Sequence, residues 1–177
     1  YNQSLYITII LRIFVSTLNP AMTMDTATFS TLKVAEIEIN YKNRVNPSDR
    51  PKITRSQDCF ELLKSIWNMD KIEYVEEFYV VLLNRANRVL GVSRISEGAT
   101  AGCIVDPKRV FQAALKSNAS GIILAHNHPS GQTVPSDSDV NITNKIKNAG
   151  SFLEISVLDH LIITPYEFFS FSDNGYL

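Results

Sequence analysis

The sequence predicts one α/β domain in which helices flank a mixed β-sheet. With 177 residues and 45% hydrophobic composition, the chain is large enough for one ordinary core and too short for a second full domain. Two short apolar runs, Phe78 to Leu83 and Ile122 to His126, have the length and composition of buried strands. Apolar residues at helical spacing precede and follow these runs, and strands that alternate with helices are typical of α/β folds.

Residues 1–23 differ from the rest of the chain, and we interpret them as a non-native or disordered N-terminal extension. The apolar stretch Leu5 to Leu18 is interrupted by Arg12 and is shorter than the ~18 to 20 apolar residues of a spanning helix. It also lacks the basic segment with which a signal peptide begins. The sequence therefore predicts no membrane anchor.

Residues 24–55 are predicted to form an N-terminal strand and a basic linker. Val34 to Tyr41 alternates apolar and polar residues, which indicates an edge strand. In the linker only Asp49 opposes five cationic side chains, which are Lys42, Arg44, Arg50, Lys52 and Arg55. A solvated connection is the simpler interpretation, and a strip that contacts the phosphates of DNA is the alternative.

Residues 56–177 are predicted to form the main domain, which begins with a helix and a hairpin. Ser56 is the expected N-cap of a helix with the buried stripe Cys59, Phe60, Leu63, Ile66 and Trp67. The strand Phe78 to Leu83 then turns at Asn84 to Asn87 into a second strand, Arg88 to Val92.

The second half of the domain is predicted as helix, strand, helix and strand. Asp106 and Pro107 are typical of a helix start, and the buried stripe that follows comprises Val110, Phe111, Ala114 and Leu115. After the strand that ends at His126, a helix is expected from Ser136 to a C-terminal cap at Gly150. Phe152 to Ile163 returns as a strand. Because α/β sheets bind ligands at strand ends, His126 is expected to lie in a site.

His126 and His128 indicate a metal site. Alternate residues of an extended segment point the same way, so two of the chain's three histidines can present their imidazoles to one point. Asp139 follows a turn and a helix start, from which its carboxylate can complete a three-ligand site with an open position. Ser136 and Asp139 also have the spacing of a helix capping box, which explains both residues without a metal.

The order His-x-His-Pro, six residues, then Ser-x-x-Asp, from His126 to Asp139, resembles the JAMM motif of the JAB/MPN metalloprotease family. The string His126 to Gly131 and the later Asp159 to Ile163 are similar to the RadC branch, whose members are labelled DNA repair proteins. The similarity runs from about Glu76 to the C-terminus. It implies a JAB/MPN-like (cytidine-deaminase-like) fold and a zinc metallopeptidase or isopeptidase that holds one Zn²⁺ per chain through His126, His128 and Asp139.

In that motif the general base is a glutamate near the start of an earlier strand. The chain offers four candidates, which are Glu73, Glu76, Glu77 and Glu97. Glu76 is predicted to be the base because it stands two residues before the run Phe78 to Leu83, where the RadC pattern places a glutamate, whereas Glu77 would face the opposite side of an extended segment.

Ser136 is predicted to be the second catalytic residue, which stabilises the oxyanion by donating its hydroxyl hydrogen. Asn127 is expected to point away from the ligands and to have no catalytic role. Asp159 and His160 are left out of the ligand set. A partner for a ligating imidazole, a substrate contact and a polar pair satisfied by backbone groups all remain open for them.

The rival hypothesis is a non-catalytic or DNA-associated binding protein in repair or mobile-element biology. With Lys plus Arg 17 against Asp plus Glu 18, the net charge of -1 supplies no overall positive field, so any DNA contact must be local. Longer family members resemble one another in an N-terminal helix-hairpin-helix module, and no Gly-rich hairpin precedes Glu76. Cys59 and Cys103 lack Cys-x-x-Cys spacing, which predicts reduced thiols in a cytoplasmic protein. The substrate, the bond cleaved and the oligomeric state stay open.

Overall fold

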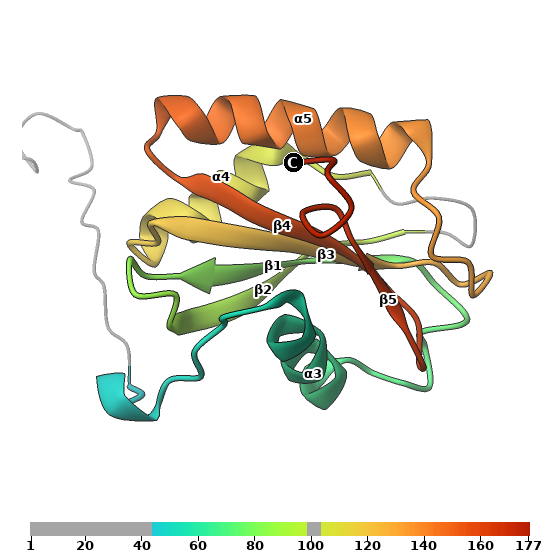
Figure 1. The fold of residues 1–177 in the computed structure, drawn as a ribbon, viewed down its shortest axis with the longest axis horizontal. Helices are drawn as coiled ribbons and strands as arrows, with labels where there is room; N and C mark the ends of the chain where they lie inside the picture. The colour runs from blue at the N-terminus through green and yellow to red at the C-terminus, as the bar shows by residue number, and fades with distance from the viewer. Residues whose placement is uncertain (1–43, 99–103) are drawn as a thin grey trace, which may run out of the picture. The chain divides into compact units, whose positions relative to one another are not determined.

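The computed structural model describes residues 44–98 and 104–177, which form a five-stranded mixed sheet with helices on both faces (Figure 1). The strands are β1 (Glu77–Leu83), β2 (Val89–Glu97), β3 (Gly121–Asn127), β4 (Ser156–Ile163) and β5 (Phe168–Ser170). The helices are α3 (Ser56–Ile66), α4 (Pro107–Lys116) and α5 (Asp137–Phe152), with the short 3-10 helix η1 (Pro47–Asp49). The predicted α/β fold class is confirmed. The predicted extension 1–23, the strand Val34 to Tyr41 and Lys42 lie outside the described residues.

The strand order is β2-β1-β3-β4-β5, and the one parallel pair is β3 with β4. Helix α5 makes the crossover between these two strands and covers one face of the sheet (Figure 1). The start of α5 therefore lies near the C-terminal end of β3. The start of β1 lies at the same end of the sheet, because Phe78 pairs with His126 in an antiparallel register.

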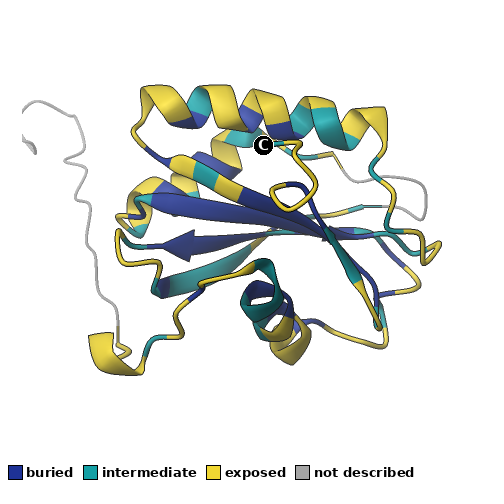
Figure 2. Cartoon of the chain, viewed as in Figure 1, coloured by how far each residue is buried: buried dark blue, intermediate teal, exposed yellow. Residues whose placement is uncertain are grey.

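The sheet separates two apolar layers, and its central strands are buried along their length (Figure 2). On one face α3 packs against the sheet through Cys59, Phe60 and Leu63, with Trp67 just beyond the helix. On the other face α4 and α5 contribute Val110, Phe111, Ala114 and Ile146. Burial of both faces explains why β1 and β3 are near-continuous apolar runs rather than alternating ones.

Two details of α3 differ from the predictions. The N-cap is Arg55 rather than Ser56, and the Asp58 carboxylate turns back to accept hydrogen bonds from Thr54 N at 2.9 Å and Thr54 Oγ1 at 2.6 Å. Ser56 lies inside the helix, where its hydroxyl contacts Ser170 Oγ at 3.2 Å. Ile66 was predicted to be buried but is 46% exposed, because the chain leaves the helix at the next residue.

The later helices also correct the predictions at their ends. Asp106 caps α4 as predicted, but Leu115 on its last turn is 56% exposed. Helix α5 continues past Gly150 to Phe152, with Leu153 as the C-cap. Gly150 is instead buried inside the helix, close under the carbonyl of Ile155. The last long strand therefore starts at Ser156 rather than Phe152, and β5 was not predicted.

Candidate metal centre

Strand β3 delivers the two histidines. His126 is the penultimate residue of the strand and is 1% exposed, while His128 follows directly after it. The side chain between them, Asn127, points to the other face, so both imidazoles reach the same side. The two Nε2 atoms are 2.9 Å apart.

Helix α5 supplies Asp139 from its first turn. Ser136 is the N-cap: its Oγ accepts from Asp139 N at 3.2 Å, and the Asp139 Oδ2 accepts from Ser136 N at 2.8 Å and from Ser136 Oγ at 2.6 Å. The other oxygen, Oδ1, lies 3.2 Å from His126 Nε2. Asp139 Oδ2 is also 3.5 Å from His128 Nε2. Asp139 therefore takes part in both the capping box and the ligand cluster: Oδ2 accepts from Ser136, and Oδ1 faces His126.

The donor set fits a divalent metal. One ligand atom from each of His126, His128 and Asp139 lies within 4.8 Å of the others. Bonds of ~2.0 to 2.1 Å to a tetrahedral zinc place ligand atoms about 3.3 Å apart, and the separations of 2.9, 3.2 and 3.5 Å bracket this value. Two neutral imidazoles and one carboxylate match the ligands that zinc takes in hydrolases, although iron, cobalt and manganese accept them too.

The surroundings fix the charge of the acid and the tautomer of one histidine. Burial favours the neutral acid, but hydrogen bonds from His126 and His128 outweigh it and hold the pKa of Asp139 well below its usual range. The hydrogen bond to Asp139 raises the pKa of His128, against the effect of partial burial. His128 Nδ1 lies 2.8 Å from the carbonyl oxygen of Gln132, which can only accept, so this nitrogen carries the hydrogen. In a neutral His128, Nε2 therefore carries no hydrogen, and its lone pair faces the cluster.

The two adjacent glutamates are placed differently. Glu76 directly precedes β1, and its negative charge contributes to the raised pKa of His128. Glu77 is 1% exposed and lies on the other face, where its Oε1 accepts from Arg94 at 2.8 Å. That Glu76 faces the ligands, on the opposite side from Glu77, stays a prediction.

Asn127 holds the segment before β1 in place, a role that the sequence did not reveal. Its Oδ1 accepts from Glu77 N at 2.8 Å, and its Nδ2 donates to the carbonyls of Ile72 at 2.6 Å and Val75 at 2.9 Å. The side chain is fully buried. The loop that carries Glu76 is therefore attached to the strand that carries the histidines.

Ser136 lies next to Asp139 at the exposed rim of the cluster, and in this structure its hydroxyl hydrogen is directed to Asp139 Oδ2. His160 lies behind His126, with its Nε2 2.8 Å from His126 Nδ1. Burial holds the pKa of His160 well below its usual value. His160 is separated from the metal-facing nitrogens by the His126 ring, which agrees with its omission from the predicted ligand set.

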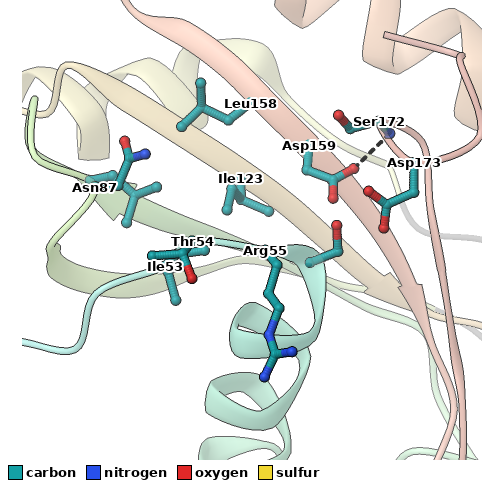
Figure 3. A pocket seen from close by; sticks show the side chains of 11 residues that line it. Ile53, Thr54, Arg55, Asn87, Ile123, Leu158, Asp159, Ser172 and Asp173 are labelled. Atoms are coloured by element: carbon teal, nitrogen blue, oxygen red, sulfur yellow. Dashed lines mark hydrogen bonds between the residues drawn. The ribbon is translucent and has the colours of Figure 1, made fainter.

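Asp159 faces the opposite side of the sheet from His160. It lines a pocket of about 230 Å³ near the start of α3, where it accepts a hydrogen bond from Ser172 N at 2.9 Å (Figure 3). It also accepts from Ser170 Oγ at 2.7 Å. His126, His128 and Asp139 do not line this pocket. Asp159 therefore orders the C-terminal turn rather than the metal cluster.

The basic residues of the predicted linker are described from Arg44 onward. Arg50 donates from Nε and Nη2 to the carbonyl of Val45, and Arg55 forms an ion pair with Asp58 at 3.0 Å. Lys52 and Arg44 are exposed. Two cations of the predicted positive strip, Arg50 and Arg55, therefore already have partners within the chain.

Comparison with known proteins places the same region in one family. A sequence model of the family described as "RadC-like JAB domain" matches residues 53–176. A protein of Flavobacterium johnsoniae, named "UPF0758 protein", is 43% identical over 143 residues, which cover 80% of this chain and 61% of that protein. A "UPF0758 protein" of Desulfitobacterium hafniense is 38% identical over 157 residues, covering 87% of this chain and 66% of the relative. The chain spans less than two thirds of the length of these relatives.

Proposed function

The chain belongs to the RadC-like JAB domain family, and we propose that it is a zinc-dependent metallohydrolase of the JAMM type that cleaves peptide or isopeptide bonds. The observation that carries this proposal is the convergence of His126, His128 and Asp139 beside the start of β1, where Glu76 lies. The names of the relatives state no activity, so the chemistry rests on the ligand cluster and on the family's JAB character.

Each residue of the cluster has a distinct task in this proposal. Bound zinc would supply a Lewis acid that lowers the pKa of a water toward about 7 and polarises the substrate carbonyl. Glu76 takes the proton from the attacking water and passes it to the leaving nitrogen. Ser136 donates its hydroxyl hydrogen to the oxyanion after turning away from Asp139, a contribution that reaches about 3 to 4 kcal/mol for one well-placed donor.

Elemental mass spectrometry of the purified protein, after removal of loosely held ions, tests the metal site. The wild type should contain about one zinc per chain, and His128→Ala should lose most of it because only two protein ligands would remain. A wild type that holds no zinc and takes up none when zinc is added would overturn the proposal.

The adjacent glutamates provide a matched pair for the catalytic step. Glu76→Gln should retain zinc and lose hydrolysis of a protein or peptide substrate, because the amide cannot take the proton. Glu77→Gln is the control: it changes the neighbouring carboxylate, which pairs with Arg94 on the other face, and should retain both zinc and hydrolysis. Full activity in Glu76→Gln would remove Glu76 from the mechanism.

A cytoplasmic location is part of the proposal. The described thiol, Cys59, is buried and forms no disulfide, as in proteins of reducing compartments. Within residues 44–98 and 104–177, no helix has the length and apolar character needed to cross a membrane.

DNA binding through the linker is a separate proposal. It rests on the exposed Arg44 and Lys52 and on two further cations, Arg50 and Arg55, that already have partners. A gel shift with duplex DNA at low salt, lost when Arg44 and Lys52 are changed to Gln, would support it. No shift at low salt would exclude it.

A further inference from the structure

We propose that His160 and Thr143 are positioning residues that fix the tautomer of His126 and thereby aim its Nε2 lone pair at the metal. The inference rests on the proposed zinc site, but its test separates the two. It assigns a role to His160, for which the sequence left three interpretations open, and to Thr143, which sequence analysis did not single out.

The contacts form a chain from one ligand to another. His126 Nδ1 lies 2.8 Å from His160 Nε2, and His160 Nδ1 lies 2.6 Å from Thr143 Oγ1. Thr143 Oγ1 lies 2.5 Å from the carbonyl oxygen of Asp139. His126, His160 and Thr143 are each at most 1% exposed, so water does not compete for these bonds.

Only one arrangement of hydrogens satisfies this chain when a metal is bound. A metal on Nε2 leaves the hydrogen of neutral His126 on Nδ1, which then donates to His160 Nε2. His160 must therefore carry its own hydrogen on Nδ1 and donate it to Thr143 Oγ1. The Thr143 hydroxyl has its hydrogen left for the carbonyl of Asp139, which can only accept. Each donor then has one acceptor. The series ends at the Asp139 carbonyl, which cannot donate, so the direction of the hydrogen bonds is fixed.

The fold aims His160 at His126 through an irregularity in β4. Val157 pairs with Ile122 but Asp159 pairs with Ile123, so one extra residue, Leu158, interrupts the register. Such a bulge reverses which side chains face each side of the sheet. It turns His160 toward α5 and His126, and it turns Asp159 toward α3.

Packing holds the His160 ring in this orientation. Phe171 stacks on it with ring centroids 4.7 Å apart, and Phe78 contacts it edge-on at 5.5 Å. Thr143 lies one helical turn after Asp139 on α5, which places its hydroxyl next to both the Asp139 carbonyl and His160. The His160 ring and the Thr143 hydroxyl are therefore already ordered before a metal binds.

A direct test reads the ring hydrogens by long-range proton–nitrogen NMR on the zinc-loaded chain labelled with ¹⁵N-histidine. The chain contains three histidines, so each ring can be assigned by one substitution. The expected result is hydrogen on Nδ1 of all three rings, with His126 and His128 bound to zinc through Nε2. Hydrogen on His160 Nε2, or a cationic His160, in a chain that binds zinc would overturn the inference and leave the metal site intact.

Thr143→Val tests the function of the relay, because valine keeps the shape of threonine but cannot accept from His160. Zinc affinity, measured by competition with a chelator, should fall about tenfold or more, and Thr143→Ser should restore most of it. Ile146→Val is the control: it shortens a fully buried side chain on the same helix, and it should lower the melting temperature without changing zinc affinity.

The outcomes separate packing from positioning. Unchanged zinc affinity in Thr143→Val, or an equal loss in Ile146→Val, would reduce Thr143 to a packing role and overturn the inference. If Thr143→Val does not fold, the NMR measurement on the wild type still decides. A wild type that takes up no zinc would overturn the proposed function, and the positioning role with it.

Discussion

The side chain of Asn127 is hydrogen-bonded to the backbone of Glu77: its Oδ1 accepts from the Glu77 N–H at 2.8 Å. Its amide nitrogen also donates to the carbonyls of Ile72 and Val75. The residue between the two histidines thus sets the position of the segment that contains the proposed base. The distance between Glu76 and the metal ligands therefore depends on the Asn127 side chain, although this side chain points away from the ligands.

Asn127→Ala is expected to destabilise the fold and to impair hydrolysis while zinc binding persists. Three backbone groups lose their partner in a buried place, which should lower the free energy of unfolding by about 2 to 4 kcal/mol in urea. A displaced Glu76 should lower turnover by up to about 100-fold. Asn144→Ala, at an exposed position of α5, is the control. Wild-type stability in Asn127→Ala would contradict the assigned role.

Zinc affinity is expected to fall as the pH drops through the pKa of His128. Zinc takes the neutral imidazole, and the hydrogen bond to Asp139 raises the pKa of His128 above its usual 6.5, so protons compete from a higher pH than usual. Below that pKa the affinity should fall about tenfold per pH unit. Asp139 adds nothing in this range because its pKa is lowered. Chelator competition between about pH 5.5 and 8 measures the slope, and a flat profile would contradict the prediction.

Gly150→Ala is expected to destabilise the chain although alanine favours helices over glycine by ~1 kcal/mol. A Cβ at this position would collide with the carbonyl oxygen of Ile155 and lie 3.6 Å from Phe111 Cε1. The net loss should be about 1 to 3 kcal/mol in urea unfolding. Gly91→Ala, where no atom lies within 4 Å of the added methyl group, should change stability by less than about 0.5 kcal/mol.

Cys59 is expected to resist alkylation in the folded chain. Burial raises the pKa of Cys59 to about 12, and the negative charges of Asp159 and Asp58 act in the same direction, so the reactive thiolate is scarce at neutral pH. Mass spectrometry after iodoacetamide treatment at about pH 8, in a Cys103→Ser background, should show labelling only after urea is added. Rapid labelling of the native chain would show that α3 opens readily.

The ligand cluster could be predicted from the sequence because its geometry is local. His126 and His128 share a side of one strand, and Ser136 and Asp139 share the first turn of one helix. Period-two and helical spacing decide both relations before any tertiary contact is known. Two short segments joined by one loop were enough.

The supporting residues could not be predicted because their roles depend on long-range register. His160 faces His126 through the bulge at Leu158, and no sequence pattern marks that bulge. Asn127 was recognised as facing away from the ligands, but its partners lie in a segment far back in the chain. The prediction of buried residues was wrong at Ile66 and Leu115, which lie at helix ends that no element of the described residues covers.

The capping box at the start of α5 bears on how the proposed site would take up a metal. Ser136 orients the Asp139 carboxylate as soon as the helix forms, so the ligand geometry is built by folding and not by coordination. The conformational entropy of that side chain is lost before any ion arrives, which leaves more of the coordination energy to appear as affinity. If the proposed site binds zinc, the chain should release the ion to a chelator and rebind it without refolding, unlike small zinc domains that unfold when their metal is removed.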